Sequence, residues 1–366
     1  MEFIKLGLSS PILKTLEEQS YTTSTAIQEK AIPAILEGKD VLGLAHTGTG
    51  KTAAYALPTL QLLSQTMRSP FSTPISTLVL VPTRELAIQI SNSFTIYGKY
   101  LSLKNMAIFG GTTQSNQVKA LKRNIDILIA TPGRLVDLIR NRHVDISAVE
   151  IFILDEADTM LDMGFSNELQ EIMKHLPDKK QTLLFSATMT NEMKEMADKI
   201  LVNPVIASIV PEATMKNNVD EEIYLVRQDE KMDVLLDFFW KNTTDSVIIF
   251  TKTKKGADEV VKELTKNKVA AKAFHSDKSQ EERKEALNNF MRKKIRALVA
   301  TDIASRGINI DDLKYVINYD LPNTIETYIH RIGRTGRAGA RGIAISYCTN
   351  RDAQLLKEIE KREEDI

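Results

Sequence analysis

The sequence has a single cysteine, a single tryptophan and no net charge. One cysteine, Cys348, excludes an internal disulfide. No run approaches the roughly 18 to 20 uninterrupted apolar residues that a membrane-spanning helix needs. The amino terminus, MEFIKLGLSS, has neither the basic region nor the apolar run of a signal peptide. These absences predict a cytoplasmic protein that does not enter a membrane.

Charge gives no general attraction to a polyanion. The 48 basic and 48 acidic side chains balance, so no overall field draws the chain to nucleic acid or to anionic lipid. Any nucleic-acid binding must therefore depend on local geometry. With 366 residues, 43% of them hydrophobic, the chain is long enough for two domains with separate cores.

Short apolar runs alternate with longer amphipathic stretches in two series. The first series is DVLGLA, STLVLVP, NMAIFG, IDILIA, VEIFIL and QTLLFS, and the second is EEIYLV, SVIIFT, VAAKAF, IRALVA, YVINYD and GIAISY. This alternation predicts an α/β protein with parallel sheets covered by helices. The intervening VIASIVPEATMKNN has no clear period, so we predict domains at residues 1–207 and 218–366 with a linker at 208–217. RDAQLLKEIEKREEDI is predicted to be a closing helix.

Residues 42–60, LGLAHTGTGKTAAYALPTL, run from a predicted strand through two glycines into a predicted helix. The backbone N–H groups of such a loop surround phosphates, and the dipole of the following helix points at them. Lys51 would pair with the outer phosphates, and the Thr52 hydroxyl would bind Mg²⁺. The alternative is a glycine-rich turn without a ligand. The predicted nucleotide contacts of the loop are Ala45, His46, Thr47, Gly48, Thr49, Gly50, Lys51 and Thr52.

Asp155-Glu156-Ala157-Asp158 follows the apolar run VEIFIL. A carboxylate at the end of a buried strand is unfavourable unless a cation meets it, and a Mg²⁺ held by Thr52 would do so. Asp155 is therefore the second predicted metal ligand. Glu156 is placed to orient or deprotonate the attacking water. The alternative is four residues of a solvated turn.

With these residues the chain resembles the DEAD-box ATP-dependent RNA helicases of superfamily 2. The resemblance covers essentially the whole chain, and the nearest subgroup is bacterial and RhlE-like. The resemblance implies two tandem RecA-like domains, each a mostly parallel sheet flanked by helices, with ATP and Mg²⁺ as cofactors. The segments that carry the resemblance are Phe3 and Gln28, AHTGTGKT, PTRELA, the glycines at 110 and 111, TPGR, DEAD, SAT, IIF, QEER, TDIASRG and HRIGRTGR.

PTRELA and TPGR each follow a predicted strand and offer a helix N-terminus with an arginine, a combination that suits a phosphate. Strand ends meet at one rim of a parallel sheet. The alternative is that the threonines and prolines only cap and start helices, and that Gln280 and Arg283 are ordinary polar residues of a helix. The resemblance implies RNA contacts by Pro82, Thr83, Arg84, Gly111, Thr131, Pro132, Gly133, Arg134, Thr251, Gln280, Arg283 and Thr301.

The run His330 to Arg337 concentrates positive charge that an anion would relieve. Arg334 and Arg337 are the predicted arginine fingers toward the terminal phosphate, against the alternative of a solvated basic turn. The resemblance adds Phe3, Thr23, Gln28 and Asn309 to the nucleotide contacts. It also implies that Asp158, Ser186, Thr188, Asp302, Arg306 and His330 couple the two ligands. Asn309 replaces the usual aspartate, which predicts weaker ATP-dependent closure.

The predicted function is RNA-stimulated ATP hydrolysis in a cleft between the domains, with single-stranded RNA clamped and bent through its backbone. Local separation of short duplexes, or remodelling of ribonucleoprotein, would follow. Two alternatives stay open, an ATP-gated RNA clamp or scaffold with little unwinding and a DNA-directed motor of superfamily 2. We expect a monomer that binds RNA without sequence preference, with partners in ribosome assembly or RNA decay as an open question.

Overall fold

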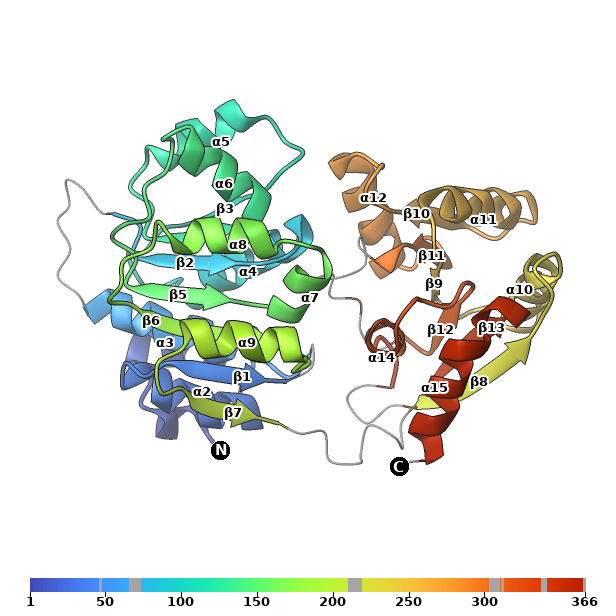
Figure 1. The fold of residues 1–366 in the computed structure, drawn as a ribbon, viewed down its shortest axis with the longest axis horizontal. Helices are drawn as coiled ribbons and strands as arrows, with labels where there is room; N and C mark the ends of the chain where they lie inside the picture. The colour runs from blue at the N-terminus through green and yellow to red at the C-terminus, as the bar shows by residue number, and fades with distance from the viewer. Residues whose placement is uncertain are drawn as a thin grey trace. The chain divides into compact units, whose positions relative to one another are not determined.

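The computed structural model describes residues 1–45, 48–65, 74–209, 219–302, 310, 313–336 and 341–364 (Figure 1). The chain divides into two units, Met1–Val210 and Pro211–Ile366. Each unit has its own parallel sheet and its own apolar clusters, and each is described by itself.

The first unit contains a seven-stranded sheet with the order β3-β4-β2-β5-β6-β1-β7. All of its strand pairs are parallel. The predicted α/β class with parallel sheets is confirmed, and each of the six predicted apolar runs forms a strand. The strands are β1 (Val41–Leu44), β2 (Thr77–Leu80), β3 (Asn105–Ile108), β4 (Ile127–Ala130), β5 (Ile151–Leu154), β6 (Gln181–Ser186) and β7 (Val205–Ser208).

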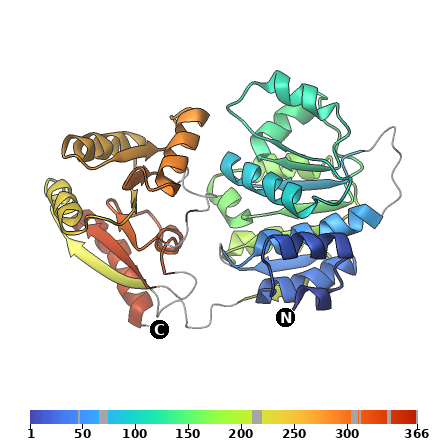
Figure 2. The same cartoon turned by 180° about the vertical axis from the view of Figure 1, so that it is seen from behind.

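Helices cover both faces of this sheet, which is why its central strands are apolar throughout instead of alternating. Figure 1 shows α8 and α9 in front of the sheet, and Figure 2 shows the blue N-terminal helices on the opposite face. Along β2, Val79 enters one apolar cluster while Leu78 and Leu80 enter the other. The helices are η1 (Phe3–Leu6), α1 (Ser10–Glu18), α2 (Ala26–Leu36), α3 (Lys51–Gln65), α4 (Arg84–Tyr97), α5 (Gln114–Leu121), α6 (Pro132–Arg140), α7 (Ala157–Asp162), α8 (Ser166–Met173) and α9 (Asn191–Ile200).

The edge strand β7 was missed by the sequence analysis. It pairs in parallel with β1 from Val41↔Val205 to Leu44↔Ser208, and Ile209 N then donates to Leu44 O at 2.9 Å. Ile206 is 62% exposed at this edge, so the segment lacks the continuous apolar run of an inner strand. Ser208 therefore lies in the sheet and not in the predicted linker, and residues 210–218 lie outside the described residues.

The second unit contains a six-stranded parallel sheet with the order β10-β11-β9-β12-β13-β8. Each of its six predicted runs forms a strand, and the predicted closing helix is α15. The strands are β8 (Val219–Leu225), β9 (Val247–Phe250), β10 (Ala271–Phe274), β11 (Ala297–Ala300), β12 (Tyr315–Asn318) and β13 (Gly342–Cys348). The helices are α10 (Lys231–Lys241), α11 (Lys254–Lys266), α12 (Gln280–Met291), α14 (Ile325–Ile332), η3 (Asn350–Asp352) and α15 (Ala353–Glu364).

Across the described ranges, no helix combines the length and the apolar character needed to cross a bilayer.

Candidate active site

The loop between β1 and α3 depends on glycine at two positions. Gly48 has φ 87° and Gly50 has φ 90°, which is left-handed backbone that favours glycine. A Cβ on Gly50 would also lie 2.4 Å from Gln28 Nε2. Ala45 is buried, and its N–H donates to Ser186 O at 3.0 Å. The described part of the loop therefore turns at its two glycines, while His46 and Thr47 lie outside the described residues.

Gln28 contacts this loop directly. Its Oε1 accepts from Thr25 N at 2.9 Å, which caps α2, and its Nε2 donates to Gly50 O at 3.2 Å. Phe3 is only 5% exposed and packs in the core of the first unit, while Thr23 is exposed and forms a backbone bridge with Glu2. The structure thus shows Gln28 supporting the phosphate loop, and the predicted nucleotide contacts of Phe3, Thr23 and Gln28 stay predictions.

Lys51 is the first residue of α3, and its side chain is buried. Its Nζ makes no hydrogen bond to any described residue. A buried ammonium group without a hydrogen-bond acceptor is unfavourable, because nothing replaces the hydrogen bonds that it made to water. A phosphate beside the loop would provide the missing interaction. Thr52, the next residue, is half-buried.

Asp155 follows β5 and is 3% exposed. Its Oδ1 accepts from Glu156 N at 2.9 Å, and its Oδ2 accepts from the Tyr55 hydroxyl at 2.9 Å. Burial raises the pKa of Asp155, and the positive charge of Lys51 is the largest effect that opposes this rise. A carboxylate and an ammonium group thus lie near each other in a buried site, and a metal–phosphate ligand would satisfy both.

Glu156 lies in left-handed backbone, with φ 52° and ψ 49°, and is 8% exposed. This conformation is uncommon for a residue with a Cβ and is frequent at functional sites. It occurs at the turn that ends β5 and starts α7, directly after Asp155. Glu156 is therefore held at the same strand end as the predicted metal ligand.

The predicted coupling residues of the first unit contact one another. Asp158 Oδ2 accepts from Ala187 N at 3.1 Å, from Thr188 N at 2.9 Å and from Thr188 Oγ1 at 3.0 Å. Ser186 Oγ in turn donates to Thr188 O at 2.7 Å. The segment after β5 is thereby tied to the segment after β6.

Two of the predicted RNA arginines lie against the loop that follows β3. The guanidinium of Arg84 packs on Gly111, where a Cβ would lie 2.1 Å from Arg84 Nη1. Arg134 donates from Nη1 to Gln117 Oε1 at 3.0 Å and from Nη2 to Thr112 O at 3.2 Å. Segments that follow three different strands thus meet at one rim.

Gln117 organises this rim and was missed by the sequence analysis. Besides holding Arg134, its Nε2 donates to Phe109 O at 3.0 Å and to Thr112 Oγ1 at 2.6 Å. It is a buried polar residue near the start of α5, which in the sequence looks like an ordinary helix residue.

The threonines at this rim differ from each other. Thr83 is buried, and its Oγ1 accepts from Leu86 N at 3.3 Å, so it caps α4. Thr131 occupies the N-cap position of α6, but its side chain makes no capping hydrogen bond. Pro82 and Pro132 are buried, and Gly133 is half-buried. The capping alternative therefore describes Thr83 well and Thr131 poorly.

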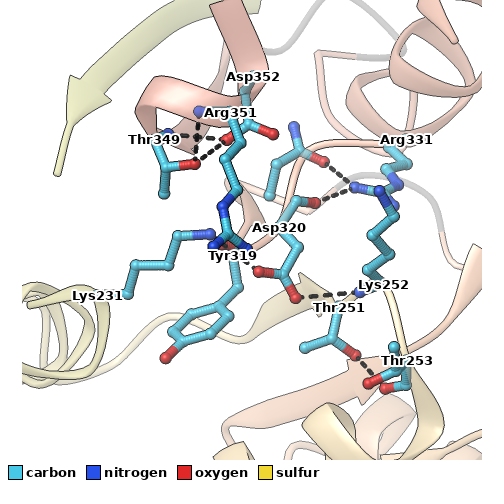
Figure 3. Close-up of polar contacts among 11 residues, drawn as sticks. Lys231, Thr251, Lys252, Thr253, Tyr319, Asp320, Arg331, Thr349, Arg351 and Asp352 are labelled. Carbon is cyan, nitrogen blue, oxygen red and sulfur yellow. Dashed lines mark hydrogen bonds and ion pairs between the residues drawn. The ribbon is translucent and has the colours of Figure 1, made fainter. Parts of the chain in front are cut away.

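In the second unit, Arg331 of α14 is 2% exposed and makes four hydrogen bonds to protein groups, and Figure 3 shows its bond to the backbone of Asp320. It donates from Nε to Asp302 Oδ1 at 2.5 Å and from Nη2 to Asp302 Oδ2 at 2.8 Å. Nη1 donates to Asn318 Oδ1 at 3.1 Å and to Asp320 O at 2.6 Å. Asp302, a predicted coupling residue, is thus paired within its own unit with a member of the HRIGRTGR cluster.

The loop at Thr251 is held by a second buried cation. Lys231 Nζ donates to Asp320 Oδ1 at 2.9 Å and to Tyr319 O at 2.7 Å, and Asp320 Oδ2 accepts from Lys252 N at 3.1 Å. Figure 3 shows this network, in which Thr251 Oγ1 donates to Thr253 O at 3.2 Å. Thr251 is completely buried, so its side chain shapes the loop in this structure.

The other predicted residues of this unit are placed as follows. Arg283 is 7% exposed with its guanidinium 4.8 Å from the ring centroid of Phe274, which favours the structural alternative for this residue. Gln280 and His330 are half-buried. Thr301 and Arg334 are buried. Arg306, Asn309 and Arg337 lie outside the described residues.

Comparison with known proteins agrees with these features. The DEAD/DEAH box helicase model matches residues 25–196, and the helicase conserved C-terminal domain model matches residues 230–339. The DEAD-box ATP-dependent RNA helicase RhpA of Helicobacter pylori is 41% identical over 359 residues, which are 98% of this chain and 72% of RhpA. The ATP-dependent RNA helicase CshA of Limosilactobacillus reuteri is 39% identical over 361 residues, which are 99% of this chain and 72% of CshA.

Among solved structures, S. cerevisiae Dbp5 bound to RNA and ADP BeF3 is similar over 100% of this chain and 94% of that chain, with 31% identity and a TM-score of 0.87. The chain belongs to the DEAD-box family of ATP-dependent RNA helicases, and its units are tandem RecA-like domains. The predicted enzyme class, an ATPase with helicase activity, is thereby confirmed. The RhlE-like subgroup stays a prediction.

Proposed function

We propose that the first unit binds ATP with Mg²⁺ at the Gly48–Lys51 loop and that RNA stimulates its hydrolysis. The observation that carries this proposal is the buried side chain of Lys51, whose ammonium group donates no hydrogen bond to any described residue. Lys51 directly follows a loop with two left-handed glycines, and its charge acts on the buried Asp155. Such a site favours a ligand that is anionic toward the loop and cationic toward the carboxylate, as a metal-bound triphosphate is.

The donor set fits magnesium. The described residues contain no group of three His, Cys, Asp or Glu side chains that would hold a metal by themselves. Magnesium usually uses one or two protein ligands together with substrate phosphates and water, so Thr52 and Asp155 would suffice. When bound, Mg²⁺ would neutralise charge on the outer phosphates.

Each residue then has a role in phosphoryl transfer. Lys51 pairs with the outer phosphates, and Glu156 accepts a hydrogen bond or a proton from the attacking water. We propose that Arg334 and Arg337 of the second unit stabilise the charge that develops on the transferred phosphate, an effect worth roughly 10³- to 10⁵-fold in comparable enzymes. That division of roles would make ATP favour the closed state and hydrolysis release it.

We propose that the rim formed by Arg84, Gly111 and Arg134 contacts the RNA backbone. Contacts to phosphate and 2′-OH groups prefer RNA over DNA and carry little sequence information. The similarity to Dbp5, whose structure is bound to RNA, supports this assignment. A bent single strand cannot remain base-paired, so clamping would separate short duplexes locally.

The experiment is RNA-dependent ATPase measured with Mg²⁺. Lys51→Ala is expected to weaken ATP binding, Glu156→Gln to keep ATP and RNA bound without turnover, and Arg334→Ala to lose turnover. Lys39→Ala is the matched control, since Lys39 is an exposed lysine of the same unit that pairs with Glu37. Normal turnover in Glu156→Gln would refute its assigned role.

Two further measurements decide between the alternatives. Equal stimulation by matched RNA and DNA oligonucleotides would favour a DNA-directed motor. Failure to displace any short RNA duplex, with RNA binding intact, would favour the ATP-gated clamp.

A further inference from the structure

Tyr55 connects the phosphate-loop helix to the strand end that carries Asp155. It is fully buried in α3, and its ring packs against Phe185 and Phe94 at centroid distances of 5.2 and 6.3 Å. Its hydroxyl donates to Asp155 Oδ2 at 2.9 Å, across 100 residues of sequence. The phosphate-loop pattern assigns this residue no role.

The buried hydroxyl contacts one of the two proposed metal ligands. Burial raises the pKa of Tyr55 well above its ordinary value, so the phenol keeps its proton. Thr52, the other proposed ligand, lies three residues earlier in the same helix, α3. The carboxylate of Asp155 is therefore held by a buried phenol that keeps its proton.

The hydrogen bonds fix the orientation of the carboxylate. One oxygen accepts from Glu156 N and the other from Tyr55, so rotation of the carboxylate plane would break both bonds. An ionised carboxylate has about four acceptor positions, which leaves roughly two for a metal ion or its water ligands. Groups that orient a metal ligand in this way usually affect metal affinity about 10- to 100-fold.

We propose that Tyr55 is a positioning residue for Mg²⁺–nucleotide binding, whose hydroxyl holds the Asp155 carboxylate in its metal-binding orientation. This inference rests on the proposed function of the site. If the hydroxyl only satisfied a buried carboxylate, its loss would change stability and leave the magnesium requirement as it is.

The test is a magnesium titration of the binding of a fluorescent, mant-labelled ATP to the whole chain. Tyr55→Phe keeps the ring and removes only the hydroxyl. In this variant we expect the Mg²⁺ concentration that gives half of the increase in mant-ATP affinity to rise by about 10-fold or more. The affinity for mant-ATP in EDTA, without free Mg²⁺, should be unchanged. Tyr97→Phe is the matched control, because Tyr97 is a buried tyrosine of the same unit that faces Tyr21 instead of the site, and it should leave the titration unchanged.

A double-variant cycle separates this inference from the proposed function. Asp155→Ala should abolish the effect of Mg²⁺, and adding Tyr55→Phe to it should change nothing further. If Mg²⁺ does not tighten binding in the wild type, or if Asp155→Ala has no effect, the proposed site is wrong. If Asp155→Ala has its effect and Tyr55→Phe matches the wild type, only the role of Tyr55 is refuted.

A second variant keeps the test decisive if Tyr55→Phe does not fold. Fluorotyrosine at position 55 retains the ring and hydroxyl and makes the hydroxyl a stronger donor. We expect it to lower the Mg²⁺ requirement, and an unchanged requirement overturns the inference.

Discussion

Replacement of Arg331 by methionine tests whether the second unit depends on its buried arginine. Arg331 pairs with Asp302 through two hydrogen bonds, donates to Asn318 and lies 5.0 Å from the ring centroid of Phe250. Arg331→Met keeps much of the apolar volume and removes the guanidinium. It leaves the completely buried Asn318 Oδ1 without this donor and the 27%-exposed Asp302 without its counter-charge.

The magnitude follows from these two losses. Removing one partner of a buried ion pair typically destabilises a protein by about 3–5 kcal/mol. Leaving a buried polar group unsatisfied costs about 1–3 kcal/mol of stability. Together the two losses amount to about 4–8 kcal/mol, and because water still reaches Asp302, we take the lower end of that range, about 4–5 kcal/mol. Since about 1.4 kcal/mol corresponds to a factor of ten, amide exchange that requires opening of this region should accelerate by at least two orders of magnitude.

Hydrogen exchange with mass spectrometry is the assay, because one melting temperature is not well defined for a chain with two units. Peptides that cover β9 and β12 should lose protection in Arg331→Met, while those that cover β2 and β5 should not. Arg351→Met is the control, since Arg351 is exposed in the same unit. Protection within threefold of the wild type at β12, or an equal loss in Arg351→Met, would refute the reasoning.

Three further variants test the first unit. Gly50→Ala should weaken mant-ATP binding by about 10-fold or more, because the new Cβ would lie 2.4 Å from Gln28 in left-handed backbone. Gly38→Ala is its control and should bind mant-ATP normally, since Gly38 also has positive φ but a Cβ there would meet no atom within 4 Å. Thr188→Val removes one hydrogen bond to Asp158, worth about 1 kcal/mol, and should lower RNA stimulation of ATPase about fivefold; undiminished stimulation would exclude this bond from coupling. Gln117→Ala releases Arg134 and should weaken RNA binding several-fold by fluorescence anisotropy, whereas the exposed neighbour Asn116→Ala should not.

The sheets were predictable because both of their faces are covered. Strands such as β2, β4 and β9 are buried at every position, so they read as continuous apolar runs between amphipathic helices. The edge strand β7 has one exposed and two half-buried residues among its four, and this mixture gives no signal of its own. The place of the site was predictable for a related reason. The predicted phosphate, metal and RNA segments each follow a strand, and the ends of parallel strands share one rim.

The partners of the site residues were not predictable, because they come from distant segments. Gln28 reaches Gly50 across 22 residues, Gln117 meets Arg134 across 17, and Tyr55 meets Asp155 across 100. None of these contacts follows from a period or a local motif. The charge argument for HRIGRTGR was incomplete for the same reason, since Asp302 neutralises Arg331 from 29 residues away.

These contacts have a common consequence for ligand binding. In the first unit Asp158 ties the segment after β5 to Thr188, and in the second unit Arg331 ties Asp302 to α14 while Lys231 ties Asp320 to the loop at Thr251. Each of these three segments is thus already held by a partner within its own unit. Ordering loops on binding would consume part of the free energy of ligand contact, and preordered loops avoid that loss. Variants of Gln117, Tyr55 or Lys231 should therefore weaken ligand binding, although none of these three residues touches a ligand in the proposed sites. Part of the free energy of ligand contact would then be used to order the loops.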